Sequence, residues 1–191
     1  MEDAPFTHLH VHSEYSLLDG AIRISQLINA CRELGMESIA LTDHGNMFGA
    51  VEFYRQARAA QVRPIIGMEA YIAPGPRGEK QAQGISEASF HLILLARNNQ
   101  GYQNLLKLAS IGYLEGFYYR PRIDREVLEA HKEGLICTSA CLKGEIPLAL
   151  ARGDIRRARE LTEYYLRLFG PDDFFLEIQW HSPDQNAITQ M

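Results

Sequence analysis

Three histidines lie two positions apart near the start of the chain, at His8, His10 and His12. The residues between them are apolar, and this alternation predicts a strand over residues 6–12. Side chains two positions apart on a strand share a face, so we expect the three imidazoles to point the same way. Imidazoles on one rigid face begin a transition-metal site, and a polar edge strand with unrelated histidines is the competing interpretation.

Two further motifs could complete such a site. Asp43 and His44 directly follow a short predicted strand in TDHGN, where turn or helix-capping roles are the alternative. Glu69 lies within the apolar run PIIGMEAYIA. A lone carboxylate in such a run is costly unless it is paired or binds a metal, so a buried salt bridge competes with a ligand role.

A thiol is the next candidate, because Cys141 ends the segment LICTSAC at the close of a predicted strand. Most free cysteines are small core residues, and we expect this of Cys31 and Cys137. Position alone leaves Cys141 open between a core thiol and a ligand.

Three more residues are weaker candidates on position. His91 lies near the start of its predicted strand rather than at the end, whereas His181 follows the segment FFLEIQW and is well placed. Asp19, in SLLDG, has the local sequence of a turn residue, and that sequence alone does not decide its role.

Imidazoles, carboxylates and one thiol together suit zinc, manganese or iron better than magnesium or calcium alone. Two or three such ions lower the pKa of a bound water and stabilise charge on phosphoryl and leaving oxygens. The sequence has no Gly-x-Ser-x-Gly elbow and no Walker loop to suggest other chemistry. It therefore predicts metal-dependent hydrolysis of a phosphate ester.

A regular alternation of strands and helices must position these residues. The predicted strands are 6–12, 38–42, 64–73, 90–96, 135–139 and 174–179. The predicted helices are 25–34, 48–60, 102–114, 124–131, 145–151 and 154–168, with another beginning near residue 184. This order favours parallel βαβ units in an α/β domain, and no Gly-x-Gly-x-x-Gly follows the first strand, so we expect a barrel. A barrel places its chemistry at the carboxyl ends of the strands.

Composition narrows the class of protein. The chain has 191 residues, which favours one domain, and 19 Lys and Arg against 24 Asp and Glu give a net charge of −5. This charge is not typical of a module that grips nucleic acid through bulk positive charge. Three cysteines without a paired framework, no signal peptide and no long apolar run predict a cytoplasmic protein that does not enter a membrane.

A short aromatic and basic segment contains Tyr118, Arg120 and Arg122. Such residues could stack on bases and contact phosphates, which makes them candidates for DNA binding. The competing interpretation, which we favour, is that the tyrosines pack a corner of the fold and the arginines are solvated.

The motifs HLHVHS, TDHGN, GMEAY and the SAC turn resemble the PHP (polymerase and histidinol phosphatase) superfamily. The segments TDHGNMFGAVEFY and GLICTSACLKGEIP resemble the branch that forms the N-terminal domain of bacterial DNA polymerase III α subunits. This likeness covers residues 5–185. It implies a distorted (β/α)7 barrel with two or three divalent ions, zinc or manganese, with magnesium as a further candidate. The implied ligands are His10, His12, Asp19, His44, Glu69, His91, Cys141 and His181.

The resemblance also implies that Asp43 supports the ligands and that the catalytic group comprises Asp43, Glu69 and His12. Many relatives have an acid where this chain has His8. The last motif of the superfamily, Asp-x-His, and the polymerase domains are absent. We therefore expect a barrel that is incomplete at its C-terminal end, in a chain cut from a longer protein.

Three functions remain open at this stage. The first is a metal-dependent 3′–5′ exonuclease acting on DNA 3′ ends. The second is a metal-stabilised scaffold that docks the remainder of the polymerase chain, the proofreading exonuclease subunit and other replisome subunits near the bacterial nucleoid. The third is a separate phosphatase of small esters such as histidinol phosphate, against which the polymerase-like segments argue.

Overall fold

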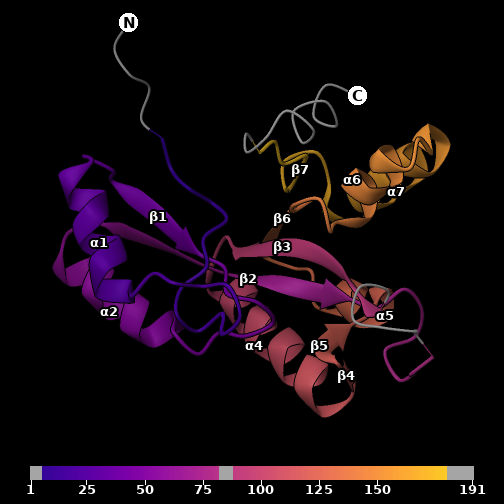
Figure 1. The fold of residues 1–191 in the computed structure, drawn as a ribbon, viewed down its shortest axis with the longest axis horizontal. Coiled ribbons are helices and arrows are strands. Elements are labelled where there is room, and N and C mark those ends of the chain that lie inside the picture. Colours follow the sequence, from indigo (N-terminus) through magenta and orange to yellow (C-terminus); the bar gives the residue numbers. More distant parts are fainter. Residues whose placement is uncertain (1–5, 82–87, 180–191) are drawn as a thin grey trace, which may run out of the picture.

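The computed structural model describes residues 6–81 and 88–179. Within these ranges seven strands form one sheet in the order β4-β5-β2-β3-β6-β7, and β1 also pairs with β2 (Figure 1). The strands are β1 (Ser38–Leu41), β2 (Arg63–Ile72), β3 (Phe90–Ala96), β4 (Phe117–Tyr118), β5 (Arg120–Ile123), β6 (Leu135–Thr138) and β7 (Phe174–Phe175). The predicted α/β class is confirmed, and the described strands form an open series.

The sheet is mixed, so the expectation of parallel βαβ units throughout is wrong. Strand β2 runs parallel to β1 and β5, and β6 runs parallel to β7. Strand β3 is antiparallel to both of its neighbours, β2 and β6. Hydrophobic periodicity is the same for both strand directions, which is why the sequence pattern did not reveal this reversal.

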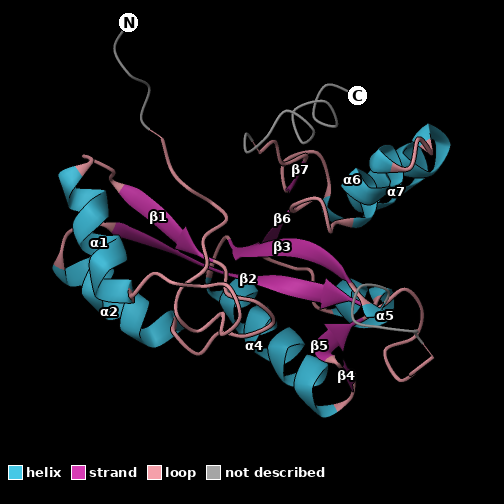
Figure 2. Ribbon diagram, in the orientation of Figure 1, coloured by secondary structure: helices cyan, strands magenta, loops and turns pink. Residues whose placement is uncertain are grey.

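Helices surround the sheet (Figure 2). They are α1 (Ile24–Glu33), α2 (Ala50–Ala59), α4 (Asn99–Leu114), α5 (Arg125–Ala130), α6 (Glu145–Ala151) and α7 (Ile155–Phe169). Asn98, Asp124 and Asp154 cap α4, α5 and α7 by accepting hydrogen bonds from backbone N–H groups of the first turn. Such caps satisfy donors that the helix itself leaves unpaired. None of the described helices is both long enough and apolar enough to cross a membrane.

Two apolar clusters hold these layers together. The larger one joins β2, β3 and β6 to α4, α5 and α7 through fully buried residues such as Leu94, Leu105 and Leu128. The smaller one packs α1 and α2 against β1 around Phe53 and Ile39. Both cores use the apolar faces that the helical and strand periodicities predict.

The two ends of the described chain differ from the expected strands. Residues 6–12 form no strand, although the Ala40 N–H donates to the His8 carbonyl at 2.9 Å and the Thr42 N–H donates to the Val11 carbonyl at 2.8 Å. The segment therefore runs beside β1 without a regular ladder. Strand β7 ends at Phe175, four residues earlier than the alternating sequence predicted. The helix expected near residue 184 lies outside the described residues.

Candidate metal centre

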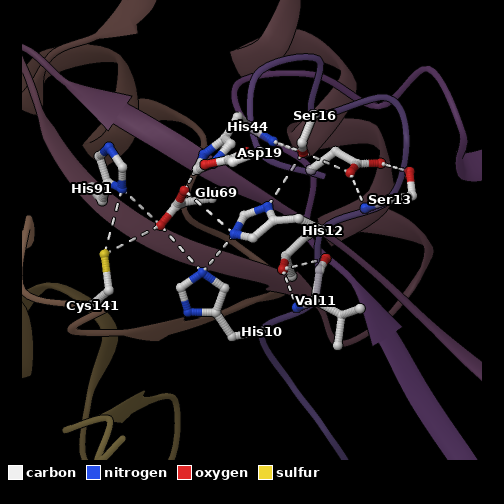
Figure 3. A network of polar contacts seen from close by, with 12 residues as sticks. His10, Val11, His12, Ser13, Ser16, Asp19, His44, Glu69, His91 and Cys141 are labelled. Carbon is white, nitrogen blue, oxygen red and sulfur yellow. Dashed lines mark hydrogen bonds and ion pairs between the residues drawn. The ribbon is translucent and has the colours of Figure 1, made fainter. Parts of the chain in front are cut away.

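A buried carboxylate lies at the middle of the site. Glu69, on β2, has no exposed surface. Four histidines and one cysteine converge on its two oxygens from separate parts of the chain (Figure 3). The carboxylate predicted from the apolar run is therefore the common contact of the cluster.

The N-terminal segment contributes two imidazoles. His10 Nε2 lies 3.2 Å from Glu69 Oε1, and His12 Nε2 lies 3.7 Å from Glu69 Oε2. The two Nε2 atoms are 3.0 Å apart. His8 is exposed, and its ring packs against Phe6. The structure therefore brings two of the three alternating histidines into the site.

The end of β1 and the start of β3 supply the next pair. His44 follows β1, its Nδ1 faces Glu69 Oε2, and its Nε2 lies 3.0 Å from Asp19 Oδ2. His91 Nδ1 lies 2.8 Å from Glu69 Oε1. Because β3 is antiparallel to β2, the start of β3 lies beside the end of β2 and pairs His91 with Tyr71. His91 was a weak candidate in the sequence because it lies near the start of its strand, but in the structure that position places it beside Glu69.

The thiol of Cys141 completes the described cluster. Its Sγ lies 3.6 Å from His91 Nδ1 and 3.8 Å from Glu69 Oε1, after the end of β6. Cys31 and Cys137 are buried in the apolar cores, as expected. His181 lies outside the described residues.

The donor set fits divalent metal ions. Two groups have ligand atoms within 4.8 Å of one another, His10–His12–Glu69 and His44–Glu69–His91, and they share the carboxylate. Among the described residues, His44 Nδ1 and Glu69 Oε2 are buried without a hydrogen-bond partner, although they face each other. Buried polar atoms are costly when unsatisfied, and a metal ion coordinated by both atoms would satisfy them.

The electrostatics of the cluster favour an ionised carboxylate beside a protonated imidazole. Burial would raise the pKa of Glu69, but interactions with His10, His44 and His91 hold it well below its ordinary value. Burial lowers the pKa of His10, yet the Glu177 and Glu69 carboxylates outweigh it and raise the pKa to about 9. Glu69 thus stays ionised, and His10 is protonated beside it at neutral pH, so His10 must lose its proton before it can coordinate a metal.

Two other donors are pushed toward their neutral forms. Burial and the neighbouring His44 ring lower the pKa of His12 to about 4. Burial, reinforced by the Glu69 carboxylate, raises the pKa of the Cys141 thiol to about 11. A neutral imidazole is ready to coordinate a metal, whereas the thiol must lose a proton to do so.

Asp43 contacts the cluster indirectly, through serine side chains. Its carboxylate accepts hydrogen bonds from the Ser13 N–H at 2.7 Å, the Ser13 hydroxyl at 2.8 Å and the Ser16 hydroxyl at 2.8 Å. The Ser16 Oγ lies 3.3 Å from His12 Nδ1. Asp43 therefore reaches the histidines through Ser16, and the structure shows no direct contact between its carboxylate and the cluster within the described ranges.

Sequence reasoning missed Glu177, which lies just past β7. Its Oε1 is 2.7 Å from His10 Nδ1, and its Oε2 accepts a hydrogen bond from the Thr138 hydroxyl at 2.5 Å. A carboxylate on the far nitrogen of a ligand histidine fixes the orientation of the ring. A glutamate inside the alternating segment FFLEIQW was the available signal, since an isolated acid there resembles the Glu69 pattern.

The predicted DNA-binding segment divides into two parts. Arg122 is buried, and its guanidinium donates to the carbonyl oxygens of Gly116, Ala88, Arg77 and Glu79. Arg122 is also stacked at 5.0 Å on the Tyr118 ring. The DNA-binding prediction for Arg122 is therefore wrong, because its donors are used to hold backbone carbonyls inside the fold.

Arg120 has a different environment. It is half-buried, and its Cζ lies 5.6 Å from the centre of the Tyr71 ring. It lines a cleft of about 1020 Å³ that also reaches Asp19, His44 and His91. The candidate metal ligands thus open onto a cavity large enough for an organic substrate.

The chain is an α/β protein with a cluster of histidines around a buried carboxylate. Comparisons with known proteins assign its family. A family model described as PHP domain matches residues 8–181, and the chain belongs to this family.

Its relatives are polymerase subunits. The chain is 52% identical to DNA polymerase III subunit alpha of Borreliella burgdorferi, over 97% of this chain and 16% of that protein. It is 48% identical to the Thermus aquaticus subunit, again over 97% of this chain and 16% of the relative. The chain therefore spans less than a fifth of the length of these relatives.

A solved amidohydrolase structure from Chromobacterium violaceum with bound sulfate aligns with 55% of this chain and 33% of its own, at 19% identity and a TM-score of 0.37. The family assignment rests on the sequence matches alone.

Proposed function

We propose that this chain is the N-terminal PHP domain of a replicative DNA polymerase III α subunit and that its cluster is a metal-dependent phosphoesterase site of the 3′–5′ exonuclease type. The observation that carries the proposal is the buried Glu69 carboxylate, which faces His10, His12, His44, His91 and Cys141 together. A structural salt bridge needs one cationic partner, whereas this carboxylate has four imidazoles around it. Metal centres of hydrolytic enzymes commonly use this mixture of donors.

The ligand assignment follows from the two groups of donors. His10, His12 and Glu69 would hold one ion, and His44, Glu69 and His91 a second, with Asp19 and Cys141 as neighbouring donors. His181 stays in the proposed set as a prediction. Zinc and manganese suit these donors best. When bound, such ions supply a hydroxide at neutral pH and stabilise charge on phosphoryl oxygens.

The residues of the chain orient this chemistry. Glu177 fixes the His10 ring, and Asp43 fixes His12 through Ser16. Tyr71 stacks on His44 at 5.9 Å and meets His91 edge-on at 5.2 Å, so it closes one side of the cluster. In this proposal His12 and Glu69 would bind the metal ions that act on the phosphate ester. Asp43 acts indirectly, by positioning His12 through Ser16.

A second candidate function is a metal-stabilised scaffold. The cluster ties the N-terminal segment to β2, β3 and the segment after β7, which a purely structural ion would also do. In this role the domain would dock the remainder of the polymerase chain, the proofreading exonuclease subunit and other replisome subunits in the bacterial cytoplasm at the nucleoid.

Measurements of metal content and of nuclease activity distinguish the phosphoesterase from the scaffold. We expect two or three equivalents of zinc, manganese or iron per chain by plasma mass spectrometry, with metal-dependent release of nucleotides from the 3′ end of single-stranded DNA. His10→Ala and His12→Ala should lose metal and lower the hydrolysis rate about a hundredfold or more. His131→Ala, at the end of α5, is the matched control. Bound metal without hydrolysis supports the scaffold, and hydrolysis that survives both site variants contradicts the enzyme.

A further inference from the structure

The cleft beside the metal centre has an aromatic wall. Phe48, Tyr113, Phe117 and Tyr119 line it, and their exposed fractions are 65%, 40%, 49% and 48%. The Phe48 and Tyr113 rings are 6.1 Å apart, and the Tyr113 and Phe117 rings are stacked 6.3 Å apart. Large rings half-open to a cavity are unusual in a core and typical of sites that bind flat ligands.

Positive charge lies between this wall and the metal centre. The Arg120 guanidinium lies over the Tyr71 ring, and Tyr71 stacks on His44 at 5.9 Å with an interplanar angle of 20°. The Tyr71 ring thus lies between the Arg120 guanidinium and His44, a candidate metal ligand. Lys143 also lines the cleft, and its carbonyl accepts a hydrogen bond from the His91 N–H at 3.0 Å.

The backbone at Tyr119 is strained. Tyr119 has a φ of 58° and is the single residue between β4 and β5, where Tyr118 pairs with Arg120. A bulky residue in the left-handed region is uncommon and costs about 1–2 kcal/mol. A glycine would avoid this cost, whereas the Tyr119 ring packs against Tyr118 at 4.5 Å and also lines the cleft.

We propose that the cleft is a binding site for the terminal nucleotides of an unpaired nucleic acid strand, with Arg120 on a backbone phosphate and the Tyr119 and Phe117 rings stacked on bases. The proposal rests on the phosphoesterase function proposed above and adds its substrate-binding residues. The rings select unpaired bases, because paired bases do not expose their faces. With a net charge of −5 on the whole chain, the attraction for phosphate is local to Arg120 and Lys143.

A small phosphate ester fits the same surface less well. The cleft measures about 1020 Å³, at the upper end of the size of small-molecule sites. A small ester bound at the metal ligands would leave the wall from Phe48 to Phe117 uncovered. Successive stacked bases would cover it.

The test is equilibrium binding by fluorescence anisotropy in the presence of chelator, so that it does not depend on metal or hydrolysis. The probes are labelled dT12, rU12 and a 12-base-pair DNA duplex. We expect the single strands to bind more tightly than the duplex, and the comparison of dT12 with rU12 shows whether the site takes DNA, RNA or both. Arg120→Ala should weaken single-strand binding about tenfold. It should also reduce the slope of log affinity against log salt by about 0.7, the contribution of one phosphate contact.

The contribution of the Tyr119 ring is tested by a second variant with a different readout. Tyr119→Gly should weaken binding about fivefold or more without changing the salt slope, while the melting temperature stays equal or rises because the strain is relieved. Arg159→Ala and Tyr54→Ala, exposed on α7 and α2 and outside the cleft lining, are the matched controls. Unchanged affinity in both cleft variants overturns the inference, as does equal affinity for duplex. A further outcome is that the parent chain binds single strands but hydrolyses no DNA. If Arg120→Ala and Tyr119→Gly then weaken binding, the result supports the cleft as a binding site and contradicts the phosphoesterase function.

Discussion

The two oxygens of Glu69 serve different groups of donors. Oε1 faces His10, His91 and Cys141, whereas Oε2 faces His12 and His44. Each of the two proposed ligand groups therefore contacts both oxygens, with His10 and His91 on Oε1 and His12 and His44 on Oε2. The carboxylate is common to the two proposed metal sites and is not divided between them.

Glu177 provides a test of orientation at the scale of one side chain. Glu177→Ala removes the partner of His10 Nδ1, and we expect it to weaken zinc binding about 10- to 100-fold, as loss of such partners does in other metal sites. Competition with a chromophoric chelator measures this affinity. Glu163→Ala, on the exposed face of α7, is the control. Equal zinc affinity in both variants would show that Glu177 does not orient the ligand.

Much of the site could be predicted from single residues, because chemistry-bearing side chains stood in motifs. The structure gathers His10, His12, Asp19, His44, Glu69, His91 and Cys141, all named from the sequence. Glu177 was missed because an acid in an alternating strand looks the same whether it faces solvent or a histidine 167 positions away. Arg120 and Arg122 are separated by one proline, and local sequence does not show which of them turns inward.

At the scale of elements, most strands and helices could be predicted within a few residues from periodicity and caps. Strand direction could not, because alternation is identical in both directions. The reversed β3 is the case that matters, since it brings His91 from a strand start to the same edge as Glu69. The irregular segment 6–12 also follows from tertiary contacts, which periodicity does not contain.

The start of α5 carries an ionic link to the loop after β2. Asp124 caps α5 and also contacts Arg77, whose N–H and guanidinium donate to its carboxylate. Burial raises the pKa of Asp124, but the hydrogen bonds from Arg77 and Val127 outweigh it and lower the pKa overall. The folded protein therefore holds Asp124 in its charged form.

This link predicts a pH dependence of stability. A carboxylate with a lowered folded pKa stabilises the protein above its unfolded pKa of about 3.9, and this contribution is lost as the pH falls through the folded pKa. Asp124→Asn should cost about 2 kcal/mol of unfolding free energy at pH 7 and progressively less below pH 4. Urea denaturation at pH 7 and pH 3 measures both. Asp154→Asn, at the cap of α7, should cost less than half as much, because asparagine caps a helix as well as aspartate does. A constant cost at both pH values would exclude the ionic link.

At the scale of the whole molecule, the site joins parts that are far apart in the sequence. Its donors come from the N-terminal segment, the ends of β1 and β6, β2, β3 and the segment after β7. A ligand that binds only this assembled form stabilises the entire fold by mass action. Metal should therefore raise global stability rather than order one loop.

Chelation tests this coupling. At a free metal concentration 100 times the dissociation constant, binding contributes about 2.7 kcal/mol. We expect chelator to lower the melting temperature by about 5–10 °C for a chain of this size. Calorimetry with and without chelator measures the shift, and Glu69→Gln should show little or none. An equal shift in Glu69→Gln would mean that the stabilising metal binds elsewhere.

The contact between His10 and Glu177 spans 167 positions, which has a consequence for the order of events during synthesis. His10 leaves the ribosome before its orienting carboxylate, which is not made until roughly 10–30 s later at ~5–20 residues per second. During that interval the histidines of the N-terminal segment are unshielded and available to any metal in the cell. For the proposed metal centre, the contact that orients His10 can therefore form only after Glu177 has been made, so the complete site exists only late in synthesis.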